Sequence, residues 1–479
     1  MSQLPDSTSD LSRRSLLRGA AAAGLLVIPA TGLLSACATG GDDTPDAPAG
    51  GGEKSAANPL GVKEDAALEV VIFNGGYGEK YATDVHEPLY KKAFPNAEIK
   101  HSSTQEISTI LQPRFAAGDP PDFVNNSGTK LMDFGALVAD QQLADLTPLW
   151  DAPSVDDPAK KVRDTVVAGT VDVGSFNGKP HVLYYVSTVF GLWYSGKLFK
   201  DKGWTIPDSW DGFLTLLGNI KKEGIIPYAY AGKNAPYYQY NVILTHAAKI
   251  GGADILKNID NLEDGAWQAD AVKQAAEAWG SLVGKGFLDK SHEGLIHTEV
   301  QLQQNQNKVA LYPSGDWLEG EQAATTPPDF EYQMATLPSL SSSDKLPFGA
   351  LRATAGEGYV VPAKGKNAAG GMEYMRQMLS KAGGRGFTEV VKAPTVVLGA
   401  SEGYAFPPGV ASSQKALGAA GANVVNLFFD GWYKDLETEA RVATNELMFG
   451  RINADQFVER LQKKADDVKK DSAVTKFTR

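Results

Sequence analysis

The sequence predicts an α/β fold in which a parallel sheet carries helices on both faces. Short apolar, β-branched runs alternate with amphipathic segments along the first part of the chain, and this alternation is typical of parallel sheets. The composition, with 43% hydrophobic and 22% charged residues, is that of an ordinary globular protein. A chain of 479 residues also exceeds one typical domain, so we expect two.

The first elements follow one another at short intervals. We expect strands and helices in the order strand 67–73, helix 81–94, strand 97–101, helix 106–117 and strand 122–125. Ligands of such sheets lie beyond the carboxyl ends of the strands. The loops at those ends hold Tyr77, Glu106, Asn125 and Asn126, which are therefore candidate binding residues.

The remainder of the chain is predicted from longer patterns. Residues 181–194 (HVLYYVSTVFGLWY) form one long extended segment that is suited to crossing between two lobes. Residues 304–315 (QNQNKVALYPSG) are expected to end a helix and begin another strand, and further strands are expected at 330–337 and 359–362. Beyond Lys364 the pattern is helical to the end of the chain.

The first 36 residues read as an export signal. Arg13 and Arg14 precede the apolar stretch 19–34, which is too short and too interrupted to span a bilayer comfortably. The paired arginines favour the twin-arginine route, which exports folded proteins, and the general secretory route is the alternative.

Cys37, the only cysteine, closes the motif Leu34-Ser35-Ala36-Cys37, which resembles the lipobox of bacterial lipoproteins. We expect lipidation at Cys37 and attachment to the outer face of the membrane by acyl chains alone. The alternative is a chance cysteine after a plain cleavage site. Residues 37–65 are rich in Gly, Ala, Pro and Asp, which predicts a flexible tether.

Composition and motifs exclude several functions. The net charge of −11 argues against a nucleic-acid-binding face. Six scattered histidines and one cysteine give no metal site, and we expect no cofactor. The chain has no nucleophile elbow, P-loop, HExxH motif or dinucleotide-binding glycine spacing, so we expect no enzymatic activity.

Aromatic residues in loops and at strand ends give the clearest functional signal. Sugar rings present apolar C–H faces that pack on Trp and Tyr, while their hydroxyls need polar partners at the rim. Asp316 and Trp317 supply both kinds of group in one short run, and Tyr184 and Tyr237 lie in similar positions. The alternative for each aromatic is core packing. Helical patterns assign Trp204, Trp210, Trp267, Trp279 and Trp432 to packing.

Several motifs resemble one family. These are RFAAGDPPDFV (114–124), FGLWYSGKLFKDKGW (190–204), NKVALYPSGDWL (307–318) and GEGYVVPAKGKN (356–367). Together with the lipobox they are similar to extracellular solute-binding proteins, family 1, of carbohydrate ABC importers. DNLEDGAW (260–267) and NELMFGRI (445–452) resemble, within that family, the N-acetylglucosamine- and diacetylchitobiose-binding lipoproteins of high-GC Gram-positive bacteria.

The resemblance implies a two-lobe periplasmic-binding-protein-like fold (type II), whose hinged lobes close on a ligand cleft. Lobe one would comprise 66–183 and 334–390, and lobe two 184–333 and 391–479. It also implies a stacking role for Trp317. Around it would lie Tyr77, Glu106, Asn125 and Asn126 from lobe one, Tyr184, Tyr237 and Asp316 from lobe two, and Glu357 in the loop after Gly356. Asp316 departs from the family, which often has a small or hydroxyl residue there.

The resemblance therefore implies a monomeric, membrane-anchored receptor. It would pass N-acetylglucosamine or N,N'-diacetylchitobiose to an ABC permease and its ATPase. Another mono- or oligosaccharide is the alternative ligand. Two other classes stay open at this point: a glycan-processing enzyme of the cell envelope, and a lipoprotein that organises polysaccharides.

Overall fold

The computed structural model describes residues 51–167 and 169–479, which belong to one compact unit. The export signal, Cys37 and the first part of the expected tether lie outside these residues. Within them, Leu60 and Val62 are already buried in a hydrophobic core, so ordered packing begins before residue 66.

The first three strands form the parallel sheet that the alternation predicted. β1 (Leu68–Phe73) pairs in parallel with both β2 (Ile99–Thr104) and β3 (Phe123–Asn125). The connections are a π-helical turn (Ala82–His86) followed by α1 (Glu87–Ala93), and α2 (Ile107–Ala117). The apolar runs thus fill the sheet, and the loops after each strand gather at one edge.

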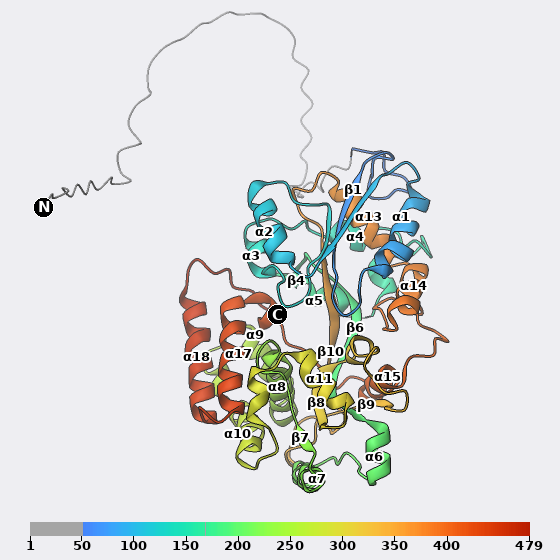
Figure 1. Ribbon diagram of the computed structural model, residues 1–479. Helices are drawn as coiled ribbons and strands as arrows, with labels where there is room; N and C mark the ends of the chain where they lie inside the picture. The colour runs from blue at the N-terminus through green and yellow to red at the C-terminus, as the bar shows by residue number, and fades with distance from the viewer. Residues whose placement is uncertain (1–50, 168) are drawn as a thin grey trace, which may run out of the picture. The chain divides into compact units, whose positions relative to one another are not determined.

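Two long strands cross the middle of the sheet. β6 (Leu183–Ser195) confirms the extended segment expected at 181–194, and β10 (Leu351–Val360) pairs with it antiparallel. β10 also pairs antiparallel with β3, so the complete sheet is mixed rather than parallel throughout. Figure 1 shows β6 and β10 running from the helices around α1, α13 and α14 to those around α6 and α7.

The sheet continues beyond β6 into the second half of the fold. β8 (Val309–Gly315) and β9 (Tyr332–Ala335) each pair antiparallel with β6, and β7 (Ile226–Tyr228) pairs in parallel with β8. The short β11 (Val424–Val425) pairs with β10 and interrupts the region after Lys364 that was expected to be entirely helical. A separate hairpin consists of β4 (Ser175–Phe176) and β5 (Lys179–Pro180).

The remaining elements are helices that cover the sheet. In chain order they are α3 (Phe134–Ala139), α4 (Thr147–Asp151), α5 (Thr170–Val173), α6 (Gly196–Lys202), α7 (Trp210–Lys222), α8 (Pro236–Gly251), α9 (Asp254–Asp260), α10 (Asp270–Gly284), α11 (His297–Asn305), α12 (Leu318–Glu321), α13 (Ala368–Met378), α14 (Lys381–Val391), α15 (Pro408–Ala420), α16 (Phe429–Trp432), α17 (Lys434–Met448) and α18 (Ala454–Lys470), with single 3₁₀ turns at Val162–Thr165, Ala266–Gln268 and Lys290–Gly294.

Buried apolar side chains form two separate cores. One surrounds β1 and the helices α1, α13 and α14, and it also takes in Val396 and Ala400. The other, larger core surrounds α7, α8, α10, α17 and α18 and extends beneath α2. Two cores joined by crossing strands are the architecture of a two-lobe binding-protein fold, in which a ligand cleft lies between the lobes.

Neither membrane spans nor metal clusters occur in the parts of the chain that the structure describes. No helix within 51–167 and 169–479 is both long and apolar enough to cross a bilayer. The same residues contain no group of three or more His, Cys, Asp or Glu side chains placed to hold a metal ion.

Candidate ligand-binding site

Two neighbouring cavities lie where the carboxyl-end loops meet the second half of the fold. The first, of about 280 Å³, is lined by Trp432 and is called the Trp432 cavity. The second, of about 310 Å³, is lined by Trp317 and is called the Trp317 cavity. Phe190 joins them: its ring centroid lies 5.4 Å from that of Trp317 and 4.1 Å from the guanidinium of Arg352, which lines the Trp432 cavity.

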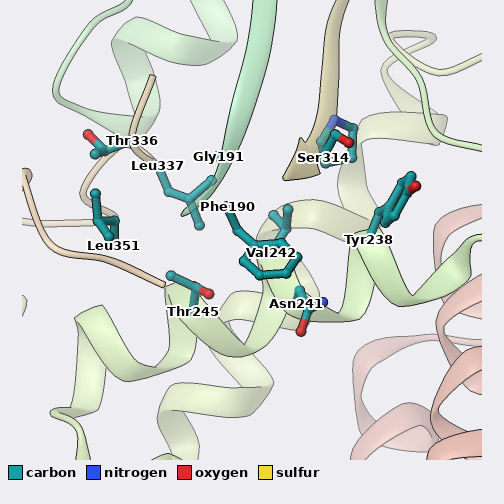
Figure 2. A pocket seen from close by; sticks show the side chains of 11 residues that line it. Phe190, Gly191, Tyr238, Asn241, Val242, Thr245, Ser314, Thr336, Leu337 and Leu351 are labelled. Carbon is teal, nitrogen blue, oxygen red and sulfur yellow. The ribbon is translucent and has the colours of Figure 1, made fainter. Parts of the chain in front are cut away.

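A third cavity, lined by Phe190 and Tyr238 among others, is too small for a sugar. Figure 2 shows Phe190 of β6 pointing toward Asn241 and Val242 of α8, with Leu337 and Leu351 nearby. Its free volume of about 20 Å³ accommodates about one water molecule. A fourth cavity, of about 470 Å³, is lined by Tyr194, Phe199 and Trp204 and contains none of the residues expected to bind ligand. The Trp432 and Trp317 cavities are the candidate site for an organic ligand, because the expected binding residues line them.

Trp317 is held by its neighbours and by a glycine. Its indole N–H donates to the Tyr238 hydroxyl at 3.3 Å, and its ring packs against the rings of Phe190 and Tyr238. A Cβ added at Gly315 would lie 1.9 Å from the Trp317 ring, so only glycine lets the indole lie against the end of β8. The ring is partly exposed, which suits a platform for an apolar ligand face.

Asp316 is almost fully buried, with 1% of its surface exposed, in the Trp317 cavity. Its Oδ2 accepts from the Val189 N–H at 3.3 Å, while Oδ1 has no hydrogen-bond partner within the described chain. Burial raises the pKa of Asp316 to about 8. At neutral pH the group is therefore mainly a neutral acid, which both donates and accepts hydrogen bonds.

Tyr77 lies near an acidic group of each cavity. It lines the Trp317 cavity, and burial, with the nearby charges of Asp316 and Glu357, raises its pKa. Glu357 in turn lines the Trp432 cavity and accepts from the Asn125 amide at 3.0 Å. The structure thus brings Tyr77, Asn125, Asp316 and Glu357 to one place, with Asn125 orienting the Glu357 carboxyl.

Asn126, Tyr184 and Tyr237 line the Trp432 cavity. Asn126 exchanges two hydrogen bonds with the backbone of Met132, of 2.8 and 2.9 Å, and so holds the loop that forms one wall. The Tyr237 ring packs under the guanidinium of Arg441, 4.8 Å from its centroid. Glu106 lies elsewhere: its side chain is 46% exposed and pairs with Lys130 at 2.6 Å. Its binding role stays a prediction.

Sequence patterns did not identify several residues that line the Trp432 cavity as binding residues. Trp432 was assigned to packing, and although it is largely buried it also lines the cavity. Arg352 and Asp430 were not singled out. The run FFDGWY (428–433) carries the available signal, because an Asp-Gly step among four aromatics is unusual inside an otherwise polar helical region.

Asp316→Asn tests the buried acid. A raised pKa means that the folded state binds the proton more tightly than the unfolded state, so this contribution to stability is complete below about pH 4 and is lost as pH rises through about 8. Asparagine does not titrate. We expect the melting temperature of the variant, relative to the parent, to rise progressively between pH 5 and 9.

The control is Asp329→Asn, which removes an exposed carboxyl. Its melting temperature should follow that of the parent protein at every pH. A pH-independent difference for Asp316→Asn would show that the buried carboxyl is ionised throughout this range.

The fold, with its crossing strands and its cavities at the carboxyl-end loops, is that of a ligand-binding protein with two lobes, and comparison with known sequences identifies the class. Residues 74–385 match the family described as bacterial extracellular solute-binding protein. The chain belongs to this family.

One curated relative covers nearly all of the chain. The diacetylchitobiose binding protein NgcE of Streptomyces coelicolor is 36% identical over 472 residues, which is 97% of this chain and 98% of the relative. A probable sugar-binding periplasmic protein of Rhizobium meliloti is 23% identical over 53% of this chain and 59% of its own length.

Solved structures show the same fold. A chain from work on xylan utilization by a thermophilic bacterium superposes with a TM-score of 0.70, covering 83% of this chain and 99% of that chain at 16% identity. A chitin oligosaccharide binding protein superposes with a TM-score of 0.65, covering 81% and 94% at 18% identity. The family and fold expected from the motifs are therefore confirmed.

Proposed function

We propose that this protein captures N,N'-diacetylchitobiose, and N-acetylglucosamine as its single unit, outside the cell and delivers the sugar unchanged to an ABC permease. The observation that carries the proposal is the pair of adjoining cavities, each lined by a tryptophan, in a member of the solute-binding family. Likeness to NgcE over nearly the whole chain supports the choice of sugar.

The site offers two platforms for a disaccharide. Trp317, which is partly exposed, and Trp432, which is 5% exposed, each line one cavity, and we assign the C–H face of one pyranose to each ring. Polar groups surround both rings: Asp316 and Tyr77 beside Trp317, and Glu357 and Asp430 beside Trp432. Sugar hydroxyls that enter this closed space need such partners, because unpaired polar groups are costly to bury.

Closure of the two lobes would trap the sugar. We retain lobe one as 66–183 with 334–390 and lobe two as 184–333 with 391–479. β6 and β10 are the natural hinge strands because they pair across its boundary. The two hydrophobic cores do not follow these bounds, since one includes Val396 and Ala400 and the other extends beneath α2. A ligand that contacts both lobes stabilises only the closed state, which gives the permease a shape to recognise.

The proposal also includes attachment of the protein to the membrane. The protein would be exported through its signal, by the twin-arginine or the general secretory route, lipidated at Cys37 and tethered as a monomer to the outer face of the membrane. It would bind sugar without acting on it. This fits a receptor that must hold a scarce nutrient beside its transporter.

Cys37→Ser tests the anchor. We expect the variant protein to move from the membrane fraction to the culture medium, because it lacks the thiol that carries the acyl chains. Immunoblots of fractionated cells measure the shift, and Ser35→Ala, which keeps a small residue before the cysteine, is the matched control. Membrane retention of Cys37→Ser would contradict lipidation at this residue.

Calorimetric titration tests the ligand. We expect diacetylchitobiose to bind more tightly than N-acetylglucosamine, and both more tightly than cellobiose or maltose. Chromatography of the same samples after prolonged incubation should return intact disaccharide. Preference for maltose or cellobiose would overturn the proposed ligand, and steady release of monosaccharide would overturn the proposed receptor.

A further inference from the structure

Arg352 is a buried cation at the edge of the Trp432 cavity. The residue lies at the start of β10 and is only 5% exposed. Its closest carboxylate atom is Asp430 Oδ2, 3.9 Å from Nη2, which is a long ion pair. In the described part of the chain, Nε and Nη1 have no hydrogen-bond partner. Arginine carries five N–H donors, so this guanidinium is short of acceptors.

The position of the guanidinium is nevertheless fixed. It lies over the Phe190 ring, 4.1 Å from the centroid, where a cation–π interaction holds it in place. Phe190 also packs against Trp317, so one aromatic ring links Arg352 to the residue that lines the Trp317 cavity. A rigid donor group that lacks hydrogen-bond partners and lies at the edge of a cavity is suited to bind an acceptor atom of a ligand.

The charged side chains around the Trp432 cavity indicate which kind of ligand group Arg352 would bind. The lining side chains include four acidic groups (Asp133, Glu357, Asp430 and Glu437) and three basic groups (Arg352, Lys434 and Arg441). Glu437 pairs with both Lys434 and Arg441, and Asp430 is the lining carboxyl that lies near Arg352. A carboxylate on the ligand would add to this excess of acid. A neutral carbonyl oxygen meets no such repulsion.

We propose that Arg352 is the specificity residue for an acetamido substituent, and that its guanidinium donates to the acetamido carbonyl oxygen. The inference rests on the proposed function and adds to it the group by which an N-acetylated sugar is told from a plain one. Asp430 orients the guanidinium from the other side. A sugar that carries a hydroxyl in place of the acetamido group offers a weaker acceptor and leaves the buried cation poorly satisfied.

Calorimetry with two sugars and three variants tests this assignment. For the parent protein we expect diacetylchitobiose to bind at least about 30-fold more tightly than cellobiose, as a charged hydrogen bond allows. Arg352→Gln and Arg352→Lys, the second of which keeps the charge but loses the planar fork, should weaken diacetylchitobiose binding about 30-fold and cellobiose binding less than about threefold. The ratio between the sugars should therefore collapse.

Arg441→Gln is the matched control. Arg441 lines the same cavity, but it already pairs with Glu437 and packs on Tyr237, so its loss should weaken both sugars alike. Melting temperatures of all three variants show which of them fold. If Arg352→Gln does not fold, Arg352→Lys alone tests the role of Arg352.

The outcomes separate the two proposals. Retention of the sugar ratio in a folded Arg352 variant would overturn the role of Arg352 while leaving the proposed ligand intact. Tighter binding of cellobiose than of diacetylchitobiose by the parent protein would overturn the proposed ligand itself. Tighter binding of a uronic-acid disaccharide than of diacetylchitobiose would show that the site selects an anion and would also overturn the role given to Arg352.

Discussion

Replacing Trp317 with alanine should weaken diacetylchitobiose binding by about 2 kcal/mol or more, roughly 30-fold, as loss of an aromatic anchor does. The indole is partly exposed in the cavity, and its edge is held by Tyr238 and Phe190. Its removal takes away a ligand surface without emptying a closed core. We therefore expect affinity, measured by calorimetry, to fall much more than the melting temperature.

Two further variants distinguish a ligand-binding role of Trp317 from a packing role. Gly315→Ala should reduce affinity too, because the new methyl group would displace the Trp317 ring that now lies over the glycine. Trp204→Ala removes a tryptophan that packs on Phe199, away from both cavities, and should leave affinity unchanged. A loss of stability with unchanged affinity in Trp317→Ala would mean that the residue only packs.

Asp260→Ala should lower the free energy of unfolding by about 3 kcal/mol and weaken sugar binding as well. The buried Asp260 Oδ1 accepts from the backbone N–H groups of Phe428 and Phe429, both at 2.8 Å, and Oδ2 pairs with Arg479 at 2.7 Å. These contacts fix the start of α16, which carries Asp430 and Trp432 into the cavity. Chemical denaturation and calorimetry measure the two effects.

Asp260→Asn separates the two contacts. The amide oxygen can still accept from both backbone N–H groups, but the ion pair with Arg479 is lost. We expect a smaller loss of stability and nearly unchanged sugar affinity. Equal affinity in Asp260→Ala and the parent protein would contradict the positioning role of this carboxyl.

Sequence patterns predicted the elements whose local signal is strong. β1 and β3 are apolar runs next to turn residues, and the long β6 was visible as an unbroken extended segment. The antiparallel pairing of β10 with β3 and β6 was not predictable in this way, because it joins segments more than 150 residues apart. Strand direction in a mixed sheet is decided by the complete chain path.

The same distinction between local signals and long-range contacts applies to the candidate site. Tyr77, Asn126, Tyr184, Tyr237, Asp316, Trp317 and Glu357 line the two cavities, and strand ends, loops and family motifs had marked them. Trp432 was missed because a helical pattern gives a tryptophan the same signature whether it packs or lines a cavity. Arg352 was missed because burial of a charge within a strand depends on its distant neighbours, Phe190 and Asp430.

A crystal structure of the protein with diacetylchitobiose would locate the bound sugar. We expect one sugar ring against Trp317, the other against Trp432, and an acetamido carbonyl oxygen within hydrogen-bond distance of Arg352. A disaccharide bound away from both tryptophans, or two unfilled cavities at saturating sugar, would contradict this expectation.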